Sequence, residues 1–432
     1  MKKLFFISLV LVLAGCSGSL KQNTEKQNIR HQNLINPAHL NFLCQNVTLP
    51  NGAKSALVHV YCNYPEYKWT DAAGQGISCV DDVTRAGVFY HDYYKQTGEK
   101  EYIERVERLV EFVLYLHADN GYFYNFVNKD LSINRDGITS KAEANWWTWR
   151  AMWFLAYVYP EMKEWNSEVS DKIKIVMDKT IATVKKNIPL KGKIEYFDGI
   201  DSAGWLPDGA ADQSSLILMG LCYYYKNIQK DQDLVFMMNR LAEGLITMQI
   251  DDKESEVFGA LLCWKNQWHG WGANQAYALL VAGQELKNKK LINAALLEID
   301  YFYNYLIKQN YLRNFTLQKT NGKISFIKKH QFSQIAYAIG PMVYSTIKAY
   351  EITENEKYAD QAVKLAMWFF GDNLAEVDMY NIKTGLVFDG INSVTDYNRN
   401  SGAESTIECL MALIAIMSNP VTEVKLNSAL KK

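Results

Sequence analysis

The sequence predicts an all-α fold in which six helical hairpins close into a ring. Polar, acidic and aromatic residues gather directly ahead of six long helical stretches, and apolar residues within those stretches recur at helical spacing. The six clusters are Gly76–Asp82, Thr139–Trp146, Gly204–Asp212, Trp268–Gly272, His330–Ser333 and Arg399–Glu404. If each cluster opens the leading helix of one hairpin, a ring of parallel leading helices brings all six clusters to one mouth.

The spacing of the clusters supports the same architecture. One anchor residue per cluster recurs every 60 to 71 residues, which is close to the length of two helices and two loops. These anchors are Asp82, Glu143, Asp212, Gly272, Ser333 and Glu404. No side-chain motif repeats with them, so the repetition is one of architecture.

The helical periodicity places the elements in order along the chain. Leading helices are expected at residues 81–96, 141–158, 209–228, 272–285, 331–351 and 402–417. Returning helices are expected at residues 101–117, 167–186, 232–249, 290–308 and 357–371. The twelfth helix is not evident, and either the tail after Pro420 or the segment 37–44 would close the ring. Short aromatic or β-prone pieces, expected as small strands or loops at the rim, lie at 121–127, 194–198, 257–264 and 385–389.

Length and composition favour one catalytic domain. Although 432 residues would permit two or three domains, no linker or charge block interrupts the helical pattern, and 48% of the residues are apolar. Residues 35–432 are therefore expected to form a single unit. The formal net charge of -1 provides no basic field for nucleic acid, and no obligate protein partner is evident.

The N-terminus has the features of a bacterial lipoprotein signal. A basic start is followed by the apolar run Leu4–Leu13 and by Ala14-Gly15-Cys16, which matches a lipobox. Residues 1–16 are thus expected as the signal, with Cys16 lipidated, and residues 17–34 as a solvated tether. The protein is expected to be exported and lipid-anchored in the cell envelope, at the outer membrane facing the periplasm or the cell surface.

The other six cysteines show no metal-finger spacing, so no zinc site is expected. They are Cys44, Cys62, Cys79, Cys222, Cys263 and Cys409. A disulfide such as Cys44–Cys62 is compatible with export, and most of the six are expected as buried thiols. The chain also has no phosphate-binding glycine loop, no zinc-protease helix motif and no calcium loop, so no cofactor is expected.

Aromatic residues at the predicted mouth suit a sugar substrate. A pyranose has apolar C–H faces and polar edges, so its site combines aromatic platforms with carboxylates and amides. The chain has 11 Trp and 27 Tyr. Candidate platforms are Trp146, Trp147, Trp205, Trp268 and Trp271. The alternative that these rings only fill the interior of the helical ring stays open.

Three of the acidic residues have a competing structural explanation. Serine caps followed by an acid three residues later have the form of a capping box. The three windows are Ser78-x-x-Asp81, Ser140-x-x-Glu143 and Ser401-x-x-Glu404. Asp81, Glu143 and Glu404 are therefore either cap partners or functional residues.

Two aspartates escape that explanation. Asp82 is turned by roughly 100° from Asp81 on a helix, so it does not fill the capping role and is the first choice for a catalytic carboxylate. Asp212 is the second choice, because Asp208 is placed to cap that helix and to contact substrate. Glycoside hydrolysis needs a proton donor and usually a second carboxylate. Asp81 and Glu404 complete the catalytic candidates.

The stretch from about residue 76 to 408 resembles the six-hairpin glycosidases, whose fold is the (α/α)6 toroid. The segments Gly76–Arg85 and Asn400–Glu408 are similar to the opening and closing motifs of a bacterial and archaeal branch of that group. The resemblance implies a carbohydrate-active enzyme, in first place a glycoside hydrolase acting on an oligo- or polysaccharide by carboxylate chemistry.

The same resemblance leaves alternatives open. Unsaturated uronyl hydrolases of glycoside hydrolase families 88 and 105 protonate a double bond, a role for Asp82 or Glu143, with Arg150 or Arg399 receiving the uronate. Polysaccharide lyases and sugar epimerases use histidine or tyrosine, and here His269 and His330 are candidates, although a substrate hydrogen bond is the more ordinary role for them. A non-catalytic glycan-binding lipoprotein is the last alternative.

Overall fold

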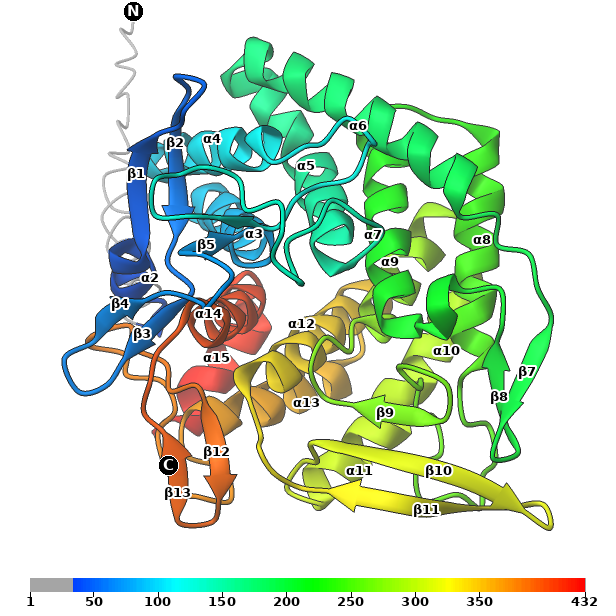
Figure 1. Ribbon diagram of the computed structural model, residues 1–432. Coiled ribbons are helices and arrows are strands. Elements are labelled where there is room, and N and C mark those ends of the chain that lie inside the picture. Colours follow the sequence, from blue (N-terminus) through cyan, green and yellow to red (C-terminus); the bar gives the residue numbers. More distant parts are fainter. Residues whose placement is uncertain (1–33, 432) are drawn as a thin grey trace, which may run out of the picture.

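The structure, a computed structural model, describes residues 34–431 as two concentric rings of helices (Figure 1). The inner ring consists of α3 (Val80–Thr97), α5 (Trp146–Trp165), α7 (Ala211–Asn227), α9 (Gln275–Glu285), α12 (Ala336–Thr353) and α14 (Ala403–Met417). Each inner helix packs on the next, and α14 packs back on α3. The predicted all-α ring of six hairpins is confirmed.

Each inner helix is followed by an outer helix that returns along the ring. The outer helices are α4 (Lys100–Tyr115), α6 (Ser167–Asn187), α8 (Gln232–Thr247), α10 (Lys289–Leu297) with α11 (Tyr303–Lys308), α13 (Glu356–Ala366) and α15 (Pro420–Ala429). The tail after Pro420 thus supplies the twelfth helix, which packs on α13 and α14. The segment 37–44 contributes the short helix α2 (Ala38–Leu43), which covers α14.

Burial explains why the inner and outer helices differ in sequence. In α14, 13 of 15 residues are buried, so the helix is apolar nearly all round. In α4, only seven of 16 residues are buried, and charged residues occupy the exposed face. The inner ring therefore forms the core, and its helix N-termini reach one end of the molecule.

Two leading helices start five residues later than predicted, at Trp146 and Ala336. Residues 141–145 form turns and bends ahead of α5, which Asn145 caps by accepting a hydrogen bond from the backbone N–H of Trp146. Residues 331–335 form a loop that pairs with Ile391 through Gln334. The longer loops leave more backbone at the mouth than the helical periodicity indicated.

Small antiparallel hairpins surround the mouth. The strands are β1 (Cys44–Thr48), β2 (Lys54–Val58), β3 (Tyr61–Asn63), β4 (Lys68–Thr70), β5 (Ser78–Cys79), β6 (Phe126–Val127), β7 (Ile194–Phe197), β8 (Ile200–Ala203), β9 (Gln267–His269), β10 (Asn314–Thr320), β11 (Lys323–His330), β12 (Gly390–Ser393) and β13 (Asp396–Asn398). The pieces 257–264 and 385–389 form isolated bridges only. The longest hairpin, β10–β11, was not predicted, although its sequence carries the signal: Phe315 and Leu317 alternate as buried residues of β10, and Asn321-Gly322 forms the turn.

The structure tests the predictions for the cysteines and for part of the N-terminal segment. All six described cysteines are free thiols, so the suggested Cys44–Cys62 disulfide is wrong, and five of the six are buried as expected. The expected signal, Cys16 and residues 17–33 of the tether lie outside the described residues. Leu34, assigned to the tether, is buried in the core.

Within residues 34–431, no single helix is long and apolar enough to cross a membrane. The pair α14 and α15 meets both conditions together, but the chain bends by 116° between them. In the fold, α14 is an inner helix of the ring.

The outer helix between α10 and α11 contains a buried acid. A π-helical turn, Glu298–Phe302, places the Glu298 carboxylate where it accepts a hydrogen bond from the backbone N–H of Leu261 at 3.0 Å. Burial raises the pKa of Glu298 to about 8, with the Leu261 N–H opposing the shift. The folded state therefore binds this proton more tightly than the unfolded state.

The buried acid predicts a pH-dependent stability. Between pH 4.5 and pH 8 the contribution of Glu298 falls as the pH rises, because the unfolded chain releases the proton first. Glu298→Gln is expected to remove this dependence. As the pH rises, the free energy of unfolding of the variant should therefore increase relative to that of the wild type, by up to about 1.4 kcal/mol per pH unit. Urea unfolding at pH 5 and pH 8 measures the difference. An identical difference at both pH values would contradict the prediction.

Candidate active site

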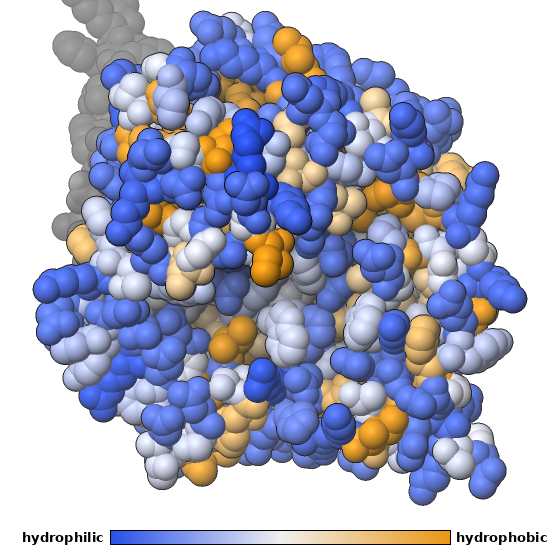
Figure 2. Space-filling model, in the orientation of Figure 1, coloured by the Kyte–Doolittle hydropathy of each residue, from blue (hydrophilic) through white to orange (hydrophobic). Residues whose placement is uncertain are grey.

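A cavity of about 680 Å³ opens at the N-terminal ends of the inner helices. Figure 2 shows this face hollowed near its centre, with hydrophobic and intermediate residues inside a mainly hydrophilic surround. Five of the six predicted clusters contribute to the lining, and Gly204–Asp212 does not. The convergence of distant clusters at one mouth is thus present in the structure for five hairpins.

The three expected capping boxes are absent. The N-cap residues of α3 and α14 are Cys79 and Gly402, and neither N-terminus has a side-chain cap. The three serines instead accept hydrogen bonds from backbone N–H groups of other segments, Ser78 from Val58, Ser140 from Phe126 and Ser401 from Val387. Since the serines tie loops together, the acids of the first turns are free to face the cavity.

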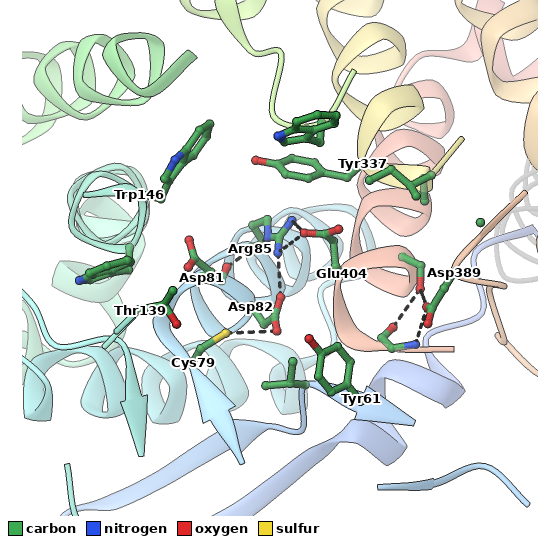
Figure 3. A pocket seen from close by; sticks show the side chains of 18 of the residues that line it. Tyr61, Cys79, Asp81, Asp82, Arg85, Thr139, Trp146, Tyr337, Asp389 and Glu404 are labelled. Atoms are coloured by element: carbon green, nitrogen blue, oxygen red, sulfur yellow. Dashed lines mark hydrogen bonds and ion pairs between the residues drawn. The ribbon is translucent and has the colours of Figure 1, made fainter. Parts of the chain in front are cut away.

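Arg85 is the centre of a carboxylate network at the floor of the cavity. Its guanidinium lies 2.7 Å from Asp82, 3.3 Å from Glu404 and 3.1 Å from Glu408. Figure 3 shows Arg85 between Asp82 and Glu404, with the ring of Tyr337 facing it at 4.8 Å from the guanidinium carbon. The network joins α3 to α14 across the closure of the ring.

A second arginine holds the neighbouring aspartate. Arg150 of α5 is buried, and its Nε lies 2.9 Å from Asp81 Oδ1. Asn125 donates a hydrogen bond to Asp81 Oδ2 at 3.2 Å, and Arg150 also donates to the Tyr337 hydroxyl. The Asp81 side chain is 22% exposed, so a paired carboxylate remains open to the cavity.

Burial raises the pKa of two carboxyl groups in the Arg85 network. Burial raises the pKa of Asp82 to about 6 although Arg85 favours the carboxylate form, and Glu404 adds a like charge. Burial likewise raises the pKa of Glu408 to about 7 against Arg85 and Arg150. Asp82 and Glu408 therefore hold their protons to a higher pH than exposed carboxyl groups do.

Asp389 is a cavity residue that the sequence analysis missed. Its Oδ1 accepts hydrogen bonds from the Gly402 backbone N–H at 2.8 Å and from Ser405 Oγ at 2.6 Å. Burial raises the pKa of this carboxyl group. Its sequence signal is weak, because Asp389 only ends the β-prone piece 385–389 and precedes no helix.

Aromatic rings form the walls. The lining includes Trp146, Trp147, Trp271, Tyr61 and Tyr337. Trp147 is 4% exposed and donates to two backbone carbonyl groups, so it is mainly part of the framework. Trp146 and Tyr337 flank the Arg150 guanidinium at 5.8 and 5.1 Å. The rings and the carboxylates together give the mixture of apolar and charged groups that a pyranose requires.

Comparisons with known proteins agree on the architecture. The chain matches a sugar epimerase from a ruminal bacterium at a TM-score of 0.61 and 11% identity, covering 90% of this chain and 98% of that one. It matches cellobiose 2-epimerase from Bacillus thermoamylovorans B4167 at a TM-score of 0.58 and 13% identity, covering 91% and 99%. The fold is the (α/α)6 toroid.

The toroid is also found in enzymes of another class. The cellulase Cel9M of C. cellulolyticum matches at a TM-score of 0.52 and 12% identity, with 92% of this chain and 98% of that chain covered. No protein-family model matches this chain, and no curated protein matches it. At these identities the likeness establishes the fold alone.

Asp212, a predicted catalytic residue, does not line the cavity of the toroid. Its Oδ2 lies 3.0 Å from His269 Nε2, and the Nδ1 of that ring lies 2.8 Å from the carbonyl oxygen of Trp271. The His269 ring also stacks on Trp271 at 4.1 Å between centroids. The Asp212–His269 pair therefore holds Trp271, which lines the cavity, in position. Asp208, expected as the cap of α7, makes no side-chain cap there.

The remaining predicted binding residues lie outside the central cavity. Trp205 is buried against Arg240, and Trp268 packs between Phe302 and Phe315. The others occupy loops or strands of the rim: Asp208 is exposed, Glu143 accepts from Asn145, His330 ends β11, and Arg399 lines a neighbouring cavity. Each of these residues lies close to a helix N-terminus in the sequence. That closeness did not predict whether the side chain points into the cavity or away from it.

Proposed function

We propose that this protein is a glycoside hydrolase that cleaves an oligo- or polysaccharide in the central cavity of the toroid. The observation that carries the proposal is the contrast between Asp81 and Asp82. Both are paired with an arginine, but the Asp81 side chain is 22% exposed at the cavity, whereas that of Asp82 is 5% exposed and burial raises its pKa to about 6. Neighbouring carboxyl groups in unlike environments are the usual basis for dividing acid and base roles.

In this mechanism Asp82 donates its proton to the glycosidic oxygen as the bond from that oxygen to the anomeric carbon breaks. The leaving sugar departs as an alcohol, and Asp82 becomes a carboxylate that Arg85 stabilises at 2.7 Å. Asp81 is the second carboxylate, facing the anomeric carbon that gains positive charge. The product's first anomer, measured by NMR, assigns whether Asp81 activates water or bonds to the sugar.

The histidines favour hydrolysis over epimerisation, although proteins named as epimerases share the toroid. Removing a proton from a sugar carbon needs a base within reach of that carbon, and histidine is the residue most often used. Among the described residues that line the cavity there is no histidine. Both ring nitrogens of His269 are occupied, and His330 lies exposed on β11.

Charge at the floor of the cavity favours a neutral sugar there. Two arginines face four carboxyl groups, those of Asp81, Asp82, Glu404 and Glu408. Arg150, expected to receive a uronate, is already paired with Asp81 and bonded to Tyr337. Both arginines of the floor are thus already paired with carboxyl groups, so neither is free to pair with a uronate, which disfavours the unsaturated uronyl hydrolase alternative at this position.

Incubation with a panel of neutral and acidic glycans tests the proposal. We expect new reducing ends from at least one substrate with a neutral sugar at the cleaved bond. Loss of an unsaturated uronide chromophore would assign the uronyl class, and gain of that chromophore would assign a lyase. Binding with no new reducing ends and no change of chromophore would favour a glycan-binding lipoprotein or an epimerase.

His269 is expected to act through Trp271. Burial opposes its charge, but the Cys263 sulfur and the Asp212 carboxylate raise the pKa of His269 to about 10, so the ring stays cationic behind the indole. His269→Ala is expected to raise KM by roughly 2- to 10-fold, the value of one aromatic contact, with kcat little changed. Steady-state kinetics measures both constants. A loss confined to kcat would instead make His269 a catalytic residue.

We also propose, from the N-terminal sequence, that the protein is exported and anchored by lipid on Cys16. Cys16→Ala is expected to move the protein from the membrane fraction to the soluble fraction and to abolish incorporation of labelled palmitate. The single change removes the acylated thiol and leaves the rest of the chain intact. Unchanged fractionation with unchanged labelling would contradict the anchor.

A further inference from the structure

A second cavity of about 510 Å³ adjoins the central one. The two share Asn392 and Asn398 in their linings, so they lie next to each other at the mouth of the toroid. The wall of the second cavity is the β12–β13 hairpin with the chain that follows it, together with Tyr64 from the loop after β3. These pieces project from the toroid at its rim (Figure 1).

Arg399 is the cation of this outer cavity. Its guanidinium carbon lies 5.4 Å from the centre of the Tyr64 ring and 5.0 Å from that of Tyr397. Arg399 Nη1 donates a hydrogen bond to the Tyr64 hydroxyl at 3.3 Å. Arg399 is exposed and pairs with no carboxylate among the described residues. The two rings hold the planar fork in place, which lowers the entropy cost of binding an anion.

We propose that this outer cavity is a subsite for a sugar residue that carries an anionic substituent, a carboxylate or a sulfate, on the same glycan chain whose neutral residue occupies the centre. The inference rests on the proposed function for the central occupant. Arg399 receives the anion through its free N–H groups, a planar and bidentate arrangement that suits either group. Tyr64 and Tyr397 contact the sugar ring.

The contrast in charge between the two cavities supports this division. At the floor of the central cavity both arginines are paired with carboxyl groups, whereas Arg399 of the outer cavity pairs with no carboxylate among the described residues. Asp396 also lines the outer cavity, and its Oδ2 accepts a hydrogen bond from Asn392 at 3.2 Å. Asp396 limits the affinity for an anion, so removing its charge is expected to strengthen binding while removal of the arginine weakens it.

Binding to the full chain carrying Asp82→Asn, measured by calorimetry, tests the subsite without turnover. The probes are oligosaccharides from glucuronoxylan, homogalacturonan and chondroitin sulfate, each compared with its carboxyl-reduced or desulfated form. We expect at least one acidic form to bind roughly tenfold more tightly than its neutral counterpart, as one charge-assisted contact provides. The form that loses affinity identifies the anion as carboxylate or sulfate.

Variants of the outer cavity provide the controls. Arg399→Gln is expected to abolish the preference, and Asp396→Asn to increase it. Arg135 is the matched control, because it is also exposed, bonds to a tyrosine hydroxyl and stacks on that ring at 4.6 Å, yet lines neither cavity. Arg135→Gln should leave the preference unchanged.

Two results would overturn the inference, and they differ from a failure of the proposed function. Equal affinity for acidic and neutral forms would reject the anionic subsite while leaving the central glycan site in place. An equal effect of Arg399→Gln and Arg135→Gln would do the same. Absence of both binding and turnover with every oligosaccharide would reject the proposed function and the subsite together.

Discussion

Asp82→Asn is expected to reduce kcat/KM for glycan hydrolysis by about 10²- to 10⁴-fold, the usual contribution of a positioned general acid. Asparagine keeps the size of the side chain but has no proton to give to the glycosidic oxygen. The loss should fall on kcat, because Asp82 is only 5% exposed and contributes little surface for binding the substrate. Initial rates on any substrate that the wild type cleaves measure the effect.

The pH dependence gives an independent signature. The pKa of Asp82 is about 6, and the proton donor must be protonated to act, so activity should fall as the pH rises through that value. In Asp82→Asn this alkaline limb should disappear from the residual activity. A variant that keeps the limb would assign the proton donor to another group.

Asp212→Asn is the matched control for this experiment. Asp212 also lies in the first turn of an inner helix, is buried and forms an ion pair, but it lies outside the cavity. Its loss should raise KM modestly through His269 and Trp271 and leave kcat within a few fold. Equal losses of kcat in Asp82→Asn and Asp212→Asn would show that charge at a helix N-terminus, and no specific proton donor, is what matters.

The second large effect is on stability. Arg85→Met is expected to lower the free energy of unfolding by about 3–5 kcal/mol at pH 7. Asp82 and Glu408 are 5% and 1% exposed at the side chain, and both lose their nearest cation in this variant. Urea unfolding of the chain measures the loss. The loss is large because two buried carboxyl groups are left without a cation. The free-energy cost of leaving them unpaired far exceeds the net stabilisation that the original ion pairs provide.

Two further measurements separate this cause from lost packing. The deficit should shrink at pH 5, because Glu408, with its pKa near 7, is then protonated and no longer needs the cation. Arg85→Met combined with Glu408→Gln should recover part of the stability. Lys425→Met, which breaks exposed ion pairs on α15, should cost at most about 1 kcal/mol. A deficit independent of pH would point to packing instead.

The position of a residue relative to a helix only partly determined whether it lines the cavity. Asp82, Glu404 and Trp146 lie in or beside a regular first turn, where helical geometry fixes the direction of the side chain. Asp212 occupies an equivalent turn, but the His269 loop covers it. Asp389 belongs to an irregular connection and enters the cavity only through its bonds to Gly402 and Ser405.

The three serine–acid motifs also show that a local sequence pattern does not determine the tertiary contacts of its residues. The serine and acid spacing is a local pattern, and it predicts a local hydrogen bond. In the structure Ser78 and Ser401 bind segments 20 and 14 residues away along the chain, and those contacts displace the helix starts. A pattern that is correct for an isolated helix is overridden once a distant backbone N–H group competes for the same hydroxyl.

The sequence by itself determined the number of hairpins, the helices within a few residues, and the gathering of most clusters at one mouth, because apolar periodicity fixes which face each helix buries. Only the tertiary structure decided which acids share Arg85, which carboxyl groups keep a proton, and where the outer cavity lies. Those properties depend on burial and on contacts between side chains up to 335 residues apart, and neither is encoded in local spacing.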